Sequence, residues 1–192
     1  MVNNICKDIL ALGADKAVCI DVADIVFDVD FRKSCEENRC GNFGRNYTCP
    51  PYAGTAQELI DKVKSYKKAV VMVCTEKISG YDDKAGMQLA DSRIAQIASL
   101  ADDYAAENGF EYMVIGGSNC KKCTPCKAVT GEKCPEPNKA FVSLSAFCID
   151  VAKLSESCGI DMVWDGTEVS YYSILLLKSQ KQNYALTDRY IY

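Results

Sequence analysis

Twelve cysteines and no histidine constrain this chain of 192 residues more than any other feature. Without histidine, Ser-His-Asp and Cys-His catalysis and every imidazole metal site are excluded. The amino terminus, MVNNICKDILALGADK, has no basic stretch followed by a long apolar run, so we expect no secretory leader and a cytoplasmic location. Disulfides rarely persist there, so clustered cysteines favour metal binding or catalysis, with a disulfide framework as the alternative.

The strongest metal-binding signal lies in residues 119–137. Its spacing, C-x2-C-x2-C-x7-C-P, contains four cysteines: Cys120, Cys123, Cys126 and Cys134. Three thiolates at two-residue gaps can wrap one face of a cube-shaped cluster, and bacterial ferredoxins use a similar run with a shorter gap before the Cys-Pro pair. Structural zinc sites usually combine two closely spaced cysteine pairs across a longer gap. The spacing therefore favours a [4Fe-4S] cluster, with zinc as the alternative.

A second cysteine-rich loop, residues 35–52, carries Cys35, Cys40 and Cys49. Three cysteines within a polar segment predict metal ligation. The loop could take a fourth ligand from elsewhere, with Cys148 or Cys158 as the first choices. It could instead hold a cluster with three thiolates and one open iron, which would bind substrate as an open zinc position does. Both loops could also contribute to one site.

Cationic residues accompany both loops. Arg45 lies in the first loop, Lys121 and Lys122 lie between cysteines of the second, and Lys127 and Lys133 follow. Nearby cations would offset thiolate charge, raise the potential of a cluster and attract an acidic redox partner. The alternative is a solvated loop with ordinary lysines. We expect the other five cysteines to be core residues: Cys6, Cys19, Cys74, Cys148 and Cys158.

Helical and strand patterns alternate along the chain. Thr55 and Glu58 form a T-x-x-E capping box before a helix, and residues 69–74 are a continuous apolar run, as in a buried parallel strand. Residues 85–107 and 143–157 have helical periodicity, whereas residues 16–27, 110–115, 160–164 and 168–177 resemble strands. We expect one α/β metal-binding domain over 1–192: a single sheet of mixed, largely parallel strands, helices on its faces and two cluster-binding loops.

Several function classes are disfavoured. The chain has 22 Lys and Arg against 26 Asp and Glu, so we expect no nucleic-acid or anionic-membrane partner. Its apolar runs fall short of the ~20 residues of a membrane-spanning helix. The P-loop and G-x-G-x-x-G nucleotide motifs are absent, although Gly116-Gly117-Ser118 could form a phosphate nest.

These motifs together resemble a family of predicted metal-binding proteins, domain-of-unknown-function family 2284. The resemblance rests on residues of both loops and of a later segment: Cys35, Cys40-Gly41, residues 44–52, Cys120, Cys123, Cys126, Cys134, Pro137 and residues 143–151. The chain departs from the family pattern at Pro135, Val142, Ser145 and Cys148. The resemblance implies metal binding and suggests an iron–sulfur centre, but it implies no reaction.

Three functions remain open from the sequence. The first is electron transfer through one or two [4Fe-4S] clusters to a redox partner protein. The second is an enzyme that binds a small-molecule substrate at an open cluster iron. The third is a structural zinc protein with four cysteine ligands that acts as a binding module, and redox sensing by exposed thiolates is a further alternative. The sequence leaves the oligomeric state open.

Overall fold

The computed structural model describes residues 5–178, which contain a four-stranded sheet of order β1-β2-β4-β3. The strands are β1 (Lys16–Asp21), β2 (Lys68–Lys77), β3 (Tyr112–Ile115) and β4 (Glu168–Leu177). All three strand pairs are antiparallel. The expectation of a largely parallel sheet is therefore wrong, although the α/β class fits.

The position of β4 explains this error. Strands β2 and β3 run in the same direction and are joined through helix α4 (Lys84–Glu107), as in a parallel crossover. The last strand, β4, lies between them and is antiparallel to both, with Lys68 opposite Leu177 and Lys77 opposite Glu168. The long apolar run in β2 thus reflects burial on both faces of the sheet rather than parallel pairing.

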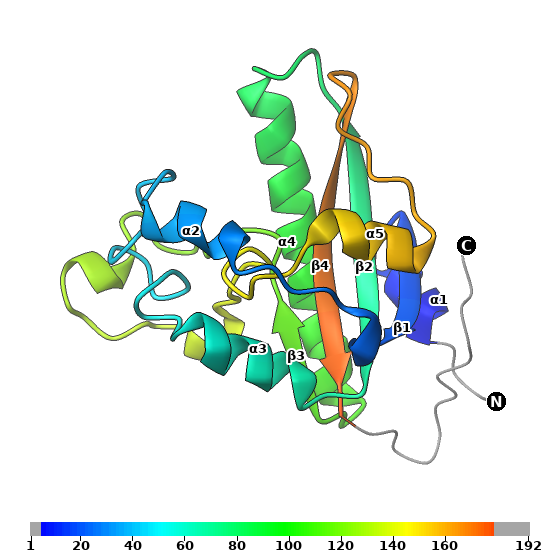
Figure 1. Cartoon of the computed structure of the whole chain (residues 1–192), viewed down its shortest axis with the longest axis horizontal. Coiled ribbons are helices and arrows are strands. Elements are labelled where there is room, and N and C mark those ends of the chain that lie inside the picture. The colour runs from blue at the N-terminus through cyan, green and yellow to red at the C-terminus, as the bar shows by residue number, and fades with distance from the viewer. Residues whose placement is uncertain (1–4, 179–192) are drawn as a thin grey trace.

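Helices cover both faces of this sheet (Figure 1). Helices α1 (Ile5–Ala11) and α4 share one apolar cluster with the sheet, in which Ile9 and Ile94 contact the face that carries Met72. Helices α3 (Ala56–Lys64) and α5 (Val151–Cys158) belong to a second cluster, in which Val63 and Leu154 lie on the opposite face. The five cysteines outside the two loops are buried, as expected.

The sequence located the start of α3 better than that of α5. The predicted capping box is confirmed: the Thr55 side chain accepts the Glu58 N–H, and the Glu58 carboxylate accepts the Thr55 N–H. Helix α5 begins at Val151 instead of residue 143, because residues 144–148 form turns between two isolated bridges and Asp150 caps the helix. Within residues 160–164, an isolated bridge from Trp164 to Val169 stands in place of the expected strand.

Both cysteine-bearing segments lie beyond the β3 edge of the sheet, on the left in Figure 1. The first begins on helix α2 (Asp30–Glu36), so Cys35 is helical rather than part of a loop. Short 3-10 turns complete the described chain: η1 (Val22–Asp24), η2 (Lys127–Val129) and η3 (Pro137–Lys139). Among residues 5–178, no helix is long and apolar enough to cross a membrane.

Candidate metal centre

Two buried polar side chains join the cysteine loops. The Asn46 amide donates to the Cys120 carbonyl at 2.8 Å, and the Cys120 N–H donates to the Thr48 hydroxyl at 2.9 Å. The Thr48 hydroxyl in turn donates to the Asn46 side-chain oxygen at 2.9 Å. Farther out, the Tyr47 hydroxyl donates to the Glu132 carbonyl. These bonds hold segments more than seventy residues apart in sequence at one place.

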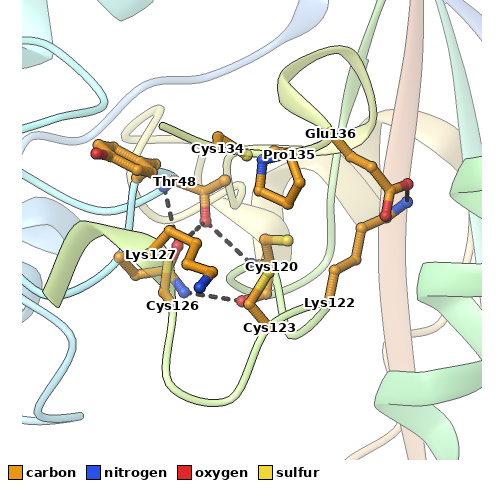
Figure 2. A pocket seen from close by; sticks show the side chains of 12 residues that line it. Thr48, Cys120, Lys122, Cys123, Cys126, Lys127, Cys134, Pro135 and Glu136 are labelled. Carbon is orange, nitrogen blue, oxygen red and sulfur yellow. Dashed lines mark hydrogen bonds and ion pairs between the residues drawn. The ribbon is translucent and has the colours of Figure 1, made fainter. Parts of the chain in front are cut away.

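The four cysteines of residues 119–137 line a single pocket (Figure 2). Thr48 reaches into it from the first loop, and Lys122 and Glu136 form an ion pair beside it. All four thiols are partly exposed. A group bound there would therefore lie close to solvent and accessible to a second molecule. The cysteines in this pocket are Cys120, Cys123, Cys126 and Cys134.

The environment of Cys120 both opposes and favours its thiolate. Burial raises the pKa of the Cys120 thiol, whereas the backbone N–H of Lys122 lowers this pKa by hydrogen bonding to the sulfur. A backbone N–H directed at a cysteine sulfur also stabilises a metal-bound thiolate and tunes the potential of a cluster. The backbone of the second loop thus directs one hydrogen-bond donor at the Cys120 sulfur.

The cysteines of the first loop differ in exposure. Cys35 is half-buried at the end of α2, Cys40 is exposed and Cys49 is buried. Burial raises the pKa of Cys49 to about 11, with smaller contributions from the nearby thiols of Cys40 and Cys35. Gly44 adopts φ +65° in the turn between them, where its N–H donates to the Pro50 carbonyl. The Cys49 thiol is thus close enough to those of Cys40 and Cys35 to interact with them.

Arg32 is a residue of this region that the sequence analysis missed. It is only 4% exposed, and its guanidinium donates to the carbonyls of Ala146 and Gly54 and, at 3.3 Å, to the Glu36 carboxylate. Its charge lowers the pKa of Cys35, although burial and the nearby Cys40 raise that pKa more. Its position three residues before Cys35, on the same helical face, was the available sequence signal.

The expected cationic residues take three different positions. Lys122 lines the pocket and pairs with Glu136, whereas Lys121 turns away to pair with Asp91 of α4. Arg45 is exposed and lines a groove together with Cys123 and Cys126. Because both lysines have carboxylate partners, they add less net positive charge around the thiols than the sequence suggested.

The glycines of Gly116-Gly117-Ser118 have a packing role instead. A Cβ on Gly117 would lie 2.8 Å from the Tyr172 carbonyl oxygen and 2.9 Å from Ile94 of α4. The Gly116 N–H donates to Val142, and the Gly116 carbonyl accepts from Leu144. The close approach of Tyr172 and Ile94 explains why position 117 is a glycine.

The donor chemistry fits a thiolate-bound metal group. Soft sulfur ligands select zinc, Cu(I) and iron–sulfur clusters. Within residues 5–178, no three cysteine, aspartate or glutamate side chains converge closely enough to hold a single metal ion. A tetrahedral zinc with sulfur ligands at about 2.3 Å would require sulfurs about 3.8 Å apart. The four cysteines of the second loop line one pocket.

Comparisons with known proteins bear on this thiol-lined site. No curated protein and no solved structure matches the chain. A family model described as a predicted metal-binding protein matches residues 18–177, which include all seven cysteines of the two loops. The match supports metal binding in general terms and names neither the metal nor a reaction. It covers most of the chain, which therefore belongs to the family of predicted metal-binding proteins DUF2284.

Proposed function

We propose that Cys120, Cys123, Cys126 and Cys134 hold a [4Fe-4S] cluster, and that the protein transfers electrons to or from a partner protein. The observation that carries this proposal is the single pocket lined by all four thiols. Their C-x2-C-x2-C-x7-C spacing suits a polynuclear cluster better than one zinc ion, whose sites usually combine two cysteine pairs across a longer gap. The family assignment supports the metal-binding part of the proposal.

A bound [4Fe-4S] cluster would accept and release single electrons at a potential set by its surroundings. The chain supplies those surroundings. Asn46 and Thr48 fix the backbone at Cys120, and the Lys122 N–H hydrogen bonds to the Cys120 sulfur. The partial exposure of the pocket thiols leaves the site open to a docking partner. These features suit outer-sphere electron transfer, which needs no substrate pocket.

Anaerobic purification and reconstitution test the proposal directly. We expect a brown protein with a broad visible absorption band, about four irons and about four sulfides for each occupied cluster, and reversible one-electron reduction. Cys123→Ala should abolish the cluster in this pocket. Cys158→Ala is the matched control, because Cys158 is a buried cysteine in the apolar cluster beneath α5. A colourless protein that contains zinc but no sulfide would refute the iron–sulfur proposal and support the zinc module.

A groove beside the pocket supports an enzyme as the second candidate function. Arg45 and Asn119 line it together with Cys123 and Cys126. A small anionic substrate could therefore approach a cluster iron from this side. Such a substrate should change the electron paramagnetic resonance spectrum of the reduced protein, and Arg45→Ala should weaken that change. A spectrum unchanged by small carboxylates and phosphates would favour electron transfer alone.

A further inference from the structure

The segment that leads into the first cysteine-bearing loop pairs with a segment about a hundred residues farther along the chain, which carries the buried Cys148. We infer that Cys35, Cys40, Cys49 and Cys148 form a second thiolate site, which holds a second iron–sulfur cluster beside the first. This inference rests on the proposed function, because it assumes that the chain binds iron–sulfur clusters. It selects Cys148 over Cys158 as the fourth ligand of this site.

Backbone pairing places Cys148 against the start of α2. The Asp28 N–H donates to the Cys148 carbonyl at 2.7 Å, and the Asp150 N–H donates to the Val26 carbonyl at 3.0 Å. Phe27 and Ile149 form an antiparallel bridge between these two bonds. The chain then enters α2, which carries Cys35 in its last turn. The segment around residue 148 is therefore fixed against the element that supplies the first ligand.

The Arg32 guanidinium connects this pair of segments to the turn at Cys49. One nitrogen donates to Ala146, two residues before Cys148, and another donates to Gly54. The turn that ends at Gly54 begins at Cys49, whose carbonyl accepts the Ala53 N–H at 3.0 Å. One side chain thus joins the three segments that carry Cys35, Cys49 and Cys148.

The charge of Arg32 points to an anionic group at this place. The guanidinium is buried, and its carboxylate partner Glu36 has a side chain that is 57% exposed. A buried cation is costly unless an opposite charge compensates it. Cys35, three residues along the same helix, and Cys148, two residues after the Ala146 carbonyl that Arg32 contacts, would supply that charge as thiolates.

Cys148 itself adopts a conformation that cysteine rarely takes. Its φ of +60° lies in the left-handed region, and its side chain is fully buried. A residue held in that region persists only where its surroundings fix it, and such residues cluster at functional sites. Cys158, by contrast, packs with Leu154 and Ile160 in the apolar cluster beneath α5.

The two thiolate sites would be immediate neighbours. Asn46 and Thr48 both lie between Cys40 and Cys49, with Thr48 directly before Cys49. Both side chains hydrogen bond to the backbone of Cys120. Two reduced clusters in neighbouring sites would interact magnetically, which gives the inference a spectroscopic signature besides metal content.

The test compares metal content and spectra of the full chain and its variants after anaerobic reconstitution with iron and sulfide. We expect about eight irons in the unchanged protein, with a reduced spectrum split by interaction between clusters. Cys148→Ser should remove the splitting. It should also lower the iron count, by about one if a three-iron cluster survives or by about four if the whole cluster is lost. Cys158→Ser is the matched buried-cysteine control and should retain about eight irons and the splitting.

A glycine variant separates ligation from folding. Cys148→Gly removes the sulfur but suits the left-handed backbone, so it should lose the same iron as Cys148→Ser while its far-ultraviolet circular dichroism stays unchanged. The inference is overturned if both variants retain about eight irons and the split spectrum. It is also overturned if the unchanged protein binds only about four irons, and if these irons are lost in Cys123→Ala but kept in Cys40→Ala. That result would leave the proposed function intact. The second site would be supported if Cys123→Ala keeps about four irons and if these irons are lost when Cys148 is also replaced.

Discussion

Thr48 determines how closely the two cysteine loops approach one another. Its hydroxyl accepts the Cys120 N–H and donates to Asn46, and the residue is only 2% exposed. The bond from the Cys120 N–H is partly buried, so water replaces a lost acceptor there only in part and stability falls. The stability of the pocket backbone therefore depends on a hydroxyl that ligates no metal in our proposals.

Replacement of this hydroxyl by a methyl group tests that role. Thr48→Val keeps the side-chain shape but removes the acceptor of the Cys120 N–H, while the Asn46 oxygen keeps its bond from the Thr48 backbone N–H. We expect the free energy of unfolding to fall by about 1–3 kcal/mol in denaturant titrations of the metal-free protein. Thr48→Ser is the control and should lose less, because it retains the hydroxyl. Equal stability of the valine variant and the unchanged protein would contradict the role.

Arg32 allows a second prediction at this scale. Arg32→Met fills similar space but leaves the carbonyls of Ala146 and Gly54 without a donor. We expect a loss of about 1–3 kcal/mol in the free energy of unfolding. Arg39→Met is the matched control: Arg39 pairs with Glu37 on the surface, and its side chain is 70% exposed. An exposed pair of this kind contributes about 0–1 kcal/mol, so the control should change little.

The sequence located the thiols but not the groups that organise them. Spacing alone is enough to single out a ligand such as Cys123, because thiolate sites have characteristic gaps. Arg32, Thr48 and Asn46 carry no such pattern, since their roles depend on carbonyls and amides that come from distant segments. The position of Cys148 beside α2 likewise depends on strand-like pairing between residues 26–28 and 148–150.

At the scale of single elements, α3 is the helix whose start was predicted from local sequence. Thr55→Ala removes the hydroxyl that accepts the Glu58 N–H and should lower the free energy of unfolding by about 1 kcal/mol. Gln57→Ala on the exposed side of the same helix is the control, and it should have a smaller effect. Thermal denaturation monitored by circular dichroism would measure both. A Thr55→Ala variant as stable as the unchanged protein would show that tertiary packing alone fixes α3.

The same cap gives stability a pH dependence. The N–H and hydroxyl of Thr55 hydrogen bond to the Glu58 carboxylate and hold the pKa of Glu58 below its ordinary value of 4.5. Its contribution to stability is therefore present above that value and is lost as pH falls through the lower pKa of the folded state. The difference in unfolding free energy between the unchanged protein and Glu58→Gln should shrink below pH 4.5. A difference that is constant with pH would contradict the assignment.

Element types were predictable where local patterns decide them, and the sheet topology was not. The capping box and the apolar periodicity of α4 are contained in short windows. Insertion of β4 between β2 and β3 depends on pairing between Lys68–Lys77 and Glu168–Leu177, a hundred residues apart. The apolar run of β2 is compatible with either direction of pairing, because helices bury both faces. Local sequence therefore cannot choose between parallel and antiparallel neighbours here.

At the scale of the whole molecule, the thiol-lined centre is separate from most of the apolar core. Two large apolar clusters lie on the two faces of the sheet and are built from β1 to β4 and the helices α1, α3, α4 and α5. The pocket cysteines instead lie on partly exposed segments beyond the β3 edge (Figure 1). Burial of apolar surface is the dominant favourable contribution to folding, so the sheet should not require the metal.

Metal removal tests this separation. We expect metal-free protein to retain its sheet and a cooperative unfolding transition, unlike small zinc domains that unfold without metal. Hydrogen exchange should show strong protection of β2 and β4 with or without metal, whereas backbone amides in residues 119–137 should lose protection when the metal is removed. The bound group should still raise the melting temperature, because it binds the folded state preferentially. Loss of protection throughout β2 and β4 on metal removal would instead show that the thiolate centre is required for the whole fold, as in a structural zinc protein.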